Sequence, residues 1–161
     1  GMTLSKAFDV EPKLVEIYEQ ELCVNTKVYE GVLPFLDYCQ QHNITMACVT
    51  NKPEHLAQGI LDILQLSPYF KMVVGGDSLA ERKPHPLPLL HCIQQQNITA
   101  SQALMIGDSS NDVEAARRAG IDCIVVSYGY NHGESIYDCQ PQQVVDSLAE
   151  LIEDDLVRRQ A

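Results

Sequence analysis

Ala103-Leu104-Met105-Ile106-Gly107-Asp108-Ser109-Ser110-Asn111-Asp112 is an apolar run followed directly by a short polar turn. The apolar residues are typical of a strand that is buried on both faces of a sheet. After the turn, small apolar side chains recur at three-to-four spacing as far as Gly120, which is typical of an amphipathic helix that ends at a glycine. A buried strand that leads directly into such a helix predicts one unit of an α/β fold.

The same alternation of strand and helix extends through most of the chain. Strands are expected at residues 44–50, 72–74, 103–106 and 121–127. Helices are expected after Pro53, from the proline cluster at 84–88 through Ile93, after Asp108, and over about 141–158. This alternation predicts an α/β fold with a Rossmann-like parallel sheet, helices on both faces and right-handed crossovers.

The N-terminal part of the chain has a different pattern. Apolar residues recur at helical spacing over 13–22, so a helix is expected there. A polar link over 24–30 follows, and Gly31 then begins a further helix that runs through Cys39.

The composition bounds the kind of protein. A chain of 161 residues with 45% hydrophobic and 20% charged residues is typical of one globular domain. The 22 acidic and 11 basic residues give a formal net charge of −11, which argues against binding of nucleic acid or of an anionic membrane surface. No apolar run approaches the ~20 residues of a membrane helix, and the N-terminus lacks the regions of a signal peptide. The six cysteines have no C-x-x-C spacing, so we expect reduced thiols and a cytoplasmic location.

Two polar groups follow expected strands at the edge of the sheet where ligands bind in such folds. Thr50-Asn51-Lys52-Pro53 offers a hydroxyl and backbone N–H groups just before a helix, which suits an oxyanion, although a threonine there is also a common helix N-cap. In Lys83-Pro84-His85-Pro86 the prolines stiffen the loop and fix the direction of the lysine. The alternative for Lys83 is an ordinary solvated lysine.

The third polar group is the turn after residue 106. Asp108 and Asp112 are four residues apart at a strand end and helix start, so they face the same side. Carboxylates in this position suit Mg²⁺, which takes oxygen ligands, although a helix N-terminus also favours acidic residues without any metal. The three groups together supply a hydroxyl, an ammonium and metal-binding carboxylates, which is the set that phosphoryl chemistry needs.

The order of these groups resembles motifs two, three and four of the haloacid dehalogenase (HAD) superfamily. The segments Val49–Pro53, Gly75–Asp77, Lys83–Pro86, Gly107–Asp112 and Tyr128–Asn131 are similar to its phosphoglycolate phosphatases. The resemblance covers about residues 13–150 and implies a Mg²⁺-dependent phosphoric monoester hydrolase that forms an aspartyl-phosphate on a small phosphorylated metabolite.

The resemblance also implies a role for each matching residue. Thr50 and Asn51 would bind the phosphoryl group. Lys83 would neutralise the phosphoryl group and the nucleophile. Asp108 would be a Mg²⁺ ligand, and Asp112 would support the metal site from one turn further along the helix.

The first motif of the superfamily, Asp-x-Asp-Gly-Thr, does not occur in this sequence. The nearest string is Ala7-Phe8-Asp9-Val10-Glu11-Pro12-Lys13, in which Asp9 would be the nucleophile, but Pro12-Lys13 replaces the Gly-Thr turn. The segment 14–31 is similar to the last helix of a cap domain and its link to the core. We therefore expect a truncated chain, with residues 1–30 as a remnant of the helical cap and its linker and residues 31–161 as the HAD-like core.

Loss of the first-motif strand would leave the centre of the sheet open. Residues 3–10 could fill the position, the neighbouring strands could close up, or a second chain could supply the strand by self-association. Because the nucleophile is missing, we expect this chain to be inactive alone. The competing hypothesis is a non-catalytic phosphate- or metal-binding remnant, or a subunit that another chain completes. A receiver domain fits less well, because its acidic pair after the first strand is absent.

Overall fold

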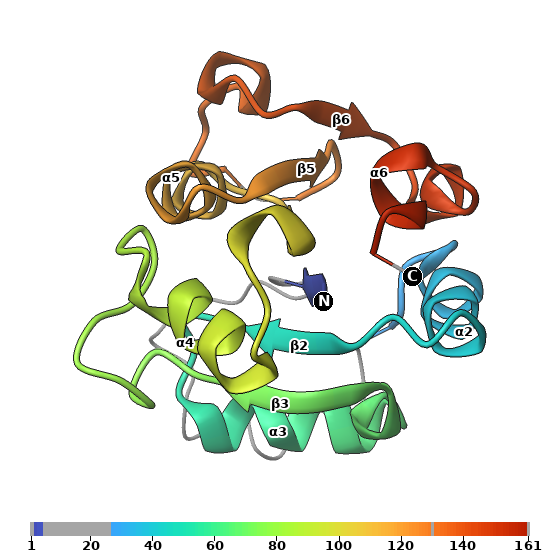
Figure 1. Cartoon of the computed structure of the whole chain (residues 1–161), viewed down its shortest axis with the longest axis horizontal. Helices are drawn as coiled ribbons and strands as arrows, with labels where there is room; N and C mark the ends of the chain where they lie inside the picture. The colour runs from blue at the N-terminus through green and yellow to red at the C-terminus, as the bar shows by residue number, and fades with distance from the viewer. Residues whose placement is uncertain (1, 5–26, 130, 161) are drawn as a thin grey trace.

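The computed structural model describes residues 2–4, 27–129 and 131–160, and it confirms a parallel α/β fold (Figure 1). Six strands form one sheet in the order β3-β2-β1-β4-β5-β6, and every pairing is parallel. The strands are β1 (Met2–Leu4), β2 (Met46–Val49), β3 (Phe70–Val74), β4 (Leu104–Gly107), β5 (Asp122–Val126) and β6 (Gln143–Val145). The strands expected from apolar runs are therefore confirmed, with bounds that differ by a few residues.

Helices cover both faces of the sheet, as the sequence predicts. The described α-helices are α2 (Val32–Gln41), α3 (Glu54–Ile63), α4 (Leu87–Gln96), α5 (Ser110–Ala119) and α6 (Asp155–Arg158). Short 3-10 turns lie at Ser67–Tyr69, Ala100–Gln102, Ile136–Cys139 and Leu148–Leu151. In Figure 1, α4 and α5 lie on one side of the strands, and α2 and α6 lie on the other side.

Alternate residues of the central strands supply the two hydrophobic cores. Leu104 and Ile106 of β4 point to the core that contains Phe35 of α2, whereas Met105 points to the core that contains Leu89 of α4 and Val113 of α5. Because successive side chains of a strand point to opposite faces, a strand between two helix layers must be apolar throughout. This explains why β2, β4 and β5 were recognisable as continuous apolar runs.

The centre of the sheet is filled by the start of the chain. Met2–Leu4 pairs with Met46–Cys48 of β2 on one side and with Leu104–Ile106 of β4 on the other. Of the three arrangements expected for this position, filling by N-terminal residues is the one found. These three residues thus belong to the core sheet rather than to a segment 1–30 outside it. A three-residue strand is too short to show a periodic pattern, so only the topology reveals it.

The expected helix over residues 141–158 is wrong. Val144 and Val145 lie in β6 at the edge of the sheet, and a single 3-10 turn and the short helix α6 follow. Ser147 and Asp154 each accept a hydrogen bond from a backbone N–H two residues further on, at Ala149 and Leu156. Residues of this kind begin a new helical turn rather than continue an existing helix, and they divide the segment into short elements.

Two expected features lie outside the described residues. These are the helix at 13–22 and Asp9. The helix that was expected to begin at Gly31 is confirmed as α2, and the glycine expected to end α5 is confirmed at Gly120, which has φ of +72°. No helix in the described ranges is long and apolar enough to cross a bilayer.

The topology fixes where a ligand site belongs. The chain moves outward through β1, β2 and β3, and β4 then returns to the other side of β1. Ligands of open parallel sheets bind at the carboxyl ends of the strands beside such a reversal. Thr50 follows β2 and Asp108 follows β4, so the two flank β1 at this position.

Substitution of Thr3 tests the central strand. Thr3→Pro removes a backbone N–H from a strand with neighbours on both sides, so we expect the free energy of unfolding to fall by about 2–4 kcal/mol. Thr3→Val keeps the N–H and is expected to change it by less than about 1 kcal/mol. Urea denaturation of both variants measures the difference. Equal values for the two variants would contradict the pairing of Met2–Leu4 in the sheet.

Candidate functional site

The polar side chains buried inside the described part of the protein belong to one region. Except in this region, the buried side chains of these residues are apolar. The buried polar set is Thr50, Lys83, Asp108, Ser109, Asp112 and Asn131. Burial of an isolated charge is costly unless the group is paired and hydrogen-bonded. A concentration of such groups at the carboxyl edge of a sheet therefore marks a candidate active site.

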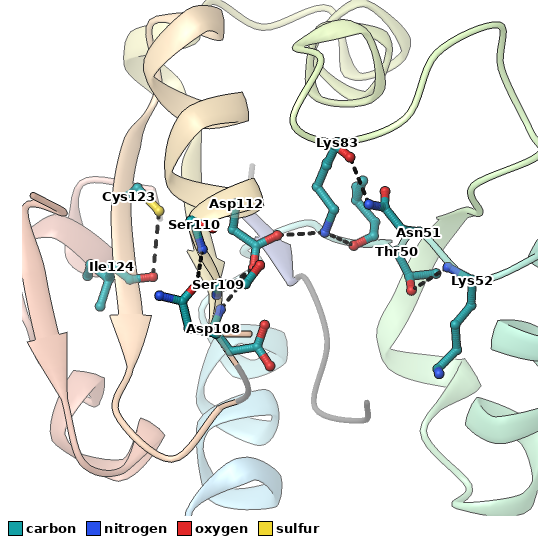
Figure 2. Close-up of polar contacts among 12 residues, drawn as sticks. Thr50, Asn51, Lys52, Lys83, Asp108, Ser109, Ser110, Asp112, Cys123 and Ile124 are labelled. Atoms are coloured by element: carbon teal, nitrogen blue, oxygen red, sulfur yellow. Dashed lines mark hydrogen bonds and ion pairs between the residues drawn. The ribbon is translucent and has the colours of Figure 1, made fainter. Parts of the chain in front are cut away.

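Lys83 is buried in this region and is not a solvated lysine. Its side chain is 4% exposed, and Nζ donates to Val49 O at 2.8 Å and to Asp112 Oδ1 at 2.7 Å (Figure 2). Val49 is the last residue of β2, so Lys83 connects the end of β2 to the start of α5. An ammonium has three N–H donors, and these two contacts leave a third for a ligand.

Asp112 holds the site together through both of its carboxylate oxygens. Oδ1 accepts from Lys83, and Oδ2 accepts from the backbone N–H groups of Asp108 at 2.9 Å and Ser109 at 3.1 Å, as well as from Ser109 Oγ at 3.1 Å. Gly107 is required here, because a Cβ on it would lie 2.4 Å from Cβ of Asp112. These contacts make Asp112 a positioning group, and a direct bond from Asp112 to a metal would have to displace one of them.

Asp108 faces a different direction from Asp112, so the expectation that the two carboxylates face the same side is wrong, because Asp108 precedes the N-cap residue Ser109 and lies outside α5. Its side chain is buried, and its carboxylate points away from the Lys83–Asp112 pair, toward the side of the site on which Thr50 lies (Figure 2). Behind Asp108 the backbone of Gly129 comes so close that a Cβ there would lie 2.1 Å from Cβ of Asp108. The backbone of Gly129 therefore limits the directions in which the Asp108 carboxylate can point.

Thr50 and Asn51 complete the opposite side of the site. Thr50 Oγ1 accepts from the backbone N–H of Lys52 at 3.1 Å, which leaves the hydroxyl proton able to donate to a ligand. Pro53 is the N-cap residue of α3, so the alternative of Thr50 as the helix N-cap is not observed. Asn51 Nδ2 donates to Lys83 O at 2.7 Å, so the amide of Asn51 holds the lysine loop. The side chain of Lys52 points away from Lys83 (Figure 2).

Sequence reasoning missed several residues that hold these loops. Asp77 Oδ1 accepts from Glu54 N at 2.8 Å and so caps α3 from the loop after β3, and Gly76 N donates to Lys52 O at 2.6 Å. His85 Nδ1 accepts from Leu87 N at 3.1 Å at the start of α4. A glycine next to a strand can indicate a close backbone approach, so Gly75-Gly76 and Gly129 could have been identified from the sequence. The partners of Asp77 and His85 depend on the tertiary fold and could not.

The charges in the site favour a cation beside Asp108. Lys83 contributes one positive charge, and Asp108 and Asp112 contribute two negative charges, all of them buried.

The charge of Asp108 also acts on Tyr128, whose ring centroid lies 4.5 Å from that of Tyr29. Burial, the neighbouring Tyr29 and the charge of Asp108 raise the pKa of Tyr128 to about 12, so its phenol stays neutral at neutral pH.

The donor types in the site fit Mg²⁺, although the described residues do not form a complete cage. No group of three or more histidine, cysteine or acidic side chains arranged to hold a metal occurs among residues 2–4, 27–129 and 131–160. Mg²⁺ requires few protein ligands, because it keeps several waters and combines one or two carboxylates with substrate phosphate oxygens. Asp108 is the described residue whose position suits that role.

The buried pair predicts a large effect of Asp112→Asn. This change leaves the Lys83 charge buried without a carboxylate, so we expect the free energy of unfolding to fall by about 3–5 kcal/mol. Lys83→Met in the Asp112→Asn background removes the uncompensated charge and is expected to recover part of the loss. Glu114→Gln is the control, because its partners Arg117 and Arg118 are about half exposed and such pairs contribute less than about 1 kcal/mol. An Asp112→Asn variant as stable as Glu114→Gln would contradict the role of the pair.

Comparison with known proteins places this arrangement in a family. A family model described as haloacid dehalogenase-like hydrolase matches residues 3–126. The chain is 43% identical over 156 residues to a phosphoglycolate phosphatase of Pseudomonas fluorescens, covering 94% of this chain and 57% of that protein. It is 42% identical over 127 residues to a phosphoglycolate phosphatase of Pseudomonas savastanoi, covering 79% of this chain and 47% of that protein.

The solved structures agree with this result. A crystal structure described as a predicted phosphoglycolate phosphatase from Haemophilus somnus superposes with a TM-score of 0.82 and 33% identity, covering 84% of this chain and 60% of that one. The chain thus spans about half the length of the curated relatives it matches. The family match includes Thr3 and Leu4 of β1, the two flanking strands and each of the loops that carry Thr50, Lys83 and Asp108. The chain belongs to the haloacid dehalogenase-like hydrolase family.

Proposed function

We propose that this site serves a Mg²⁺-dependent phosphatase that hydrolyses a small phosphomonoester, with phosphoglycolate as the first candidate substrate. The observation that carries the proposal is the buried Lys83–Asp112 pair between the loops that hold Thr50 and Asp108. A buried ammonium with a hydroxyl and a carboxylate around it suits a dianionic phosphoryl group with a divalent cation. The names of the relatives support the choice of substrate.

Five residues of the site have a definite task in this proposal. Thr50 donates its hydroxyl proton to a phosphoryl oxygen. Lys83 donates its third N–H to the phosphoryl group and offsets negative charge that develops there. Asp108 would hold Mg²⁺, which would neutralise charge on the phosphoryl oxygens when bound. Asn51 and Asp112 act through Lys83, since one holds its backbone and the other its ammonium.

The nucleophile that we propose is a carboxylate placed just beyond the end of β1. Its oxygen would form a bond to phosphorus while the bond from phosphorus to the ester oxygen breaks and the leaving oxygen takes up a proton from a water molecule. Water would then hydrolyse the acyl phosphate. The sequence has no Asp-x-Asp-Gly-Thr segment, and Asp9, which lies outside the described residues, is the first acidic residue after β1 in the sequence and hence the candidate.

Binding of inorganic phosphate tests the proposed site independently of catalysis. We expect the chain to bind inorganic phosphate more tightly with Mg²⁺ than without it, as measured by isothermal titration calorimetry. Thr50→Val removes the hydroxyl and is expected to weaken phosphate binding about tenfold, consistent with loss of one hydrogen bond to a charged group. Thr50→Ser keeps the hydroxyl and serves as the matched control. Equal affinities for the two variants would remove Thr50 from the site.

Hydrolysis tests the nucleophile. We expect the chain alone to bind phosphate without hydrolysing phosphoglycolate above background, because it lacks the first motif of the family. Turnover that Asp9→Asn abolishes would instead identify Asp9 as the nucleophile. Turnover that survives Asp9→Asn would contradict the proposed use of this carboxylate.

The second candidate is a phosphate- or metal-binding subunit without its own catalysis. The missing first motif favours it, and so would binding of phosphate and Mg²⁺ with no turnover under any condition. Addition of a chain that contains an Asp-x-Asp-Gly-Thr segment, and that can supply a carboxylate at the end of the filled central strand, would distinguish a subunit awaiting completion, which gains activity, from a remnant, which does not. The filled centre of the sheet removes the open strand edges that suggested self-association, and both self-association and the cytoplasmic location stay predictions.

A further inference from the structure

Asn131 is a buried polar side chain that the proposed reaction does not use. It is 7% exposed, although it lies in the loop between β5 and the 3-10 turn at Ile136–Cys139. Loop asparagines are mostly exposed, and each buried polar side chain has to be satisfied by hydrogen bonds. The partners of Asn131 therefore indicate why it is buried.

The amide of Asn131 connects two segments of the chain. Its Oδ1 accepts from the backbone N–H of Ser110 at 2.6 Å, and its Nδ2 donates to Glu134 O at 3.2 Å. Ser110 is the first residue of α5, whose opening N–H groups have no partner within the helix. The contact therefore caps α5 from a loop 21 residues further along the chain. The side-chain oxygen alone makes this contact with Ser110, and the side-chain N–H group makes the separate contact with Glu134 O.

The same loop contacts Asp108 through Gly129. A Cβ on Gly129 would lie 2.1 Å from Cβ and 2.8 Å from Oδ2 of Asp108, both closer than neighbouring atoms tolerate. The loop therefore contacts both ends of the turn 108–110. Gly129 packs against the side chain of Asp108, and Asn131 accepts a hydrogen bond from the backbone N–H of Ser110. Figure 2 shows Ser110 and Asp108 on successive parts of this turn, with Asp112 between them and Lys83.

We propose that Asn131 is a positioning residue that fixes the direction of the Asp108 carboxylate by holding the turn 108–110 against Gly129. The part of this inference that concerns Mg²⁺ rests on the proposed function, because Asp108 is the proposed ligand. The other part, that Asn131 holds the turn 108–110 in place, does not depend on the proposed function. Residues that orient a metal ligand from behind change metal affinity about 10- to 100-fold when they are replaced, even though they never contact the metal.

A simple helix cap would explain the same hydrogen bond without any effect on Asp108. A cap that acts only on α5 would stabilise the helix, and its loss would lower the stability of the whole protein. A positioning residue must in addition affect Asp108 and Ser109, whose N–H groups bond to Asp112 and not to Asn131. Amide exchange at these two residues separates the two roles.

The experiment compares Asn131→Ala with two other variants. Asn131→Asp keeps an acceptor for Ser110 N–H and is the conservative rescue. Asn97→Ala is the matched control, because Asn97 ends α4 in the left-handed conformation with φ of +53°, which alanine adopts with strain. It should lower stability without contact with the turn. Amide hydrogen exchange is measured by NMR on each metal-free protein, and Mg²⁺ affinity is measured by calorimetry.

We expect Asn131→Ala to speed exchange about fivefold or more at Asp108, Ser109 and Ser110 and to weaken Mg²⁺ binding about tenfold. Asn131→Asp should keep the protection of the three amides and bind Mg²⁺ at least as tightly as the unaltered protein. Asn97→Ala should leave the turn and the Mg²⁺ affinity unchanged. Faster exchange at Ser110 alone, or the same pattern in Asn131→Ala and Asn97→Ala, would overturn the proposal.

The two readouts keep the inference separate from the proposed function. If the unaltered protein and Asp108→Asn bind Mg²⁺ equally, the proposed metal role of Asp108 fails, and exchange at Asp108 and Ser109 still decides whether Asn131 positions the turn. If Mg²⁺ binding depends on Asp108 but Asn131→Ala leaves it unchanged, the positioning role fails and the metal site stands.

Discussion

The ion pair between Lys83 and Asp112 is the constraint on which the site depends. Both side chains are nearly inaccessible, and the loss of hydration of two charges is repaid only when each is fully hydrogen-bonded. Val49 O completes the lysine, and the N–H groups of Asp108 and Ser109 complete the aspartate. One buried pair therefore fixes the ends of β2 and β4 and the start of α5 relative to one another.

The arrangement of the loops follows from this constraint. The loop after β2 has to reach Lys83 through Asn51, and the turn after β4 has to wrap around Asp112 with a glycine at residue 107. Two further loops hold these segments in place. Gly76 and Asp77, after β3, contact the loop after β2. Gly129 and Asn131, after β5, contact the turn after β4. The result is a site whose polar groups are satisfied largely by the protein itself, which is the condition for electrostatic preorganisation.

The sequence predicted the parts of this protein that have strong local signals. The strands β2, β4 and β5 are continuous apolar runs because helices cover both faces, and Thr50, Lys83, Asp108 and Asp112 follow or precede them at recognisable positions. The strand Met2–Leu4 is too short to show a periodic pattern, so the sequence indicates it only as one of three ways to fill the centre of the sheet. The segment 141–158 differs from the expected helix because an edge strand and two helical turns resemble one amphipathic helix in sequence. The contact of Asn131 with Ser110 joins distant loops, and no local pattern encodes it.

A crystal structure of the protein with Mg²⁺ and inorganic phosphate tests the central claim most directly. We expect a phosphate oxygen to accept from Lys83 Nζ and from Thr50 Oγ1, the cation to lie on Asp108, and the Lys83–Asp112 pair to stay intact. Phosphate bound away from Lys83, or a cation held by Asp112 with the ion pair broken, would contradict it.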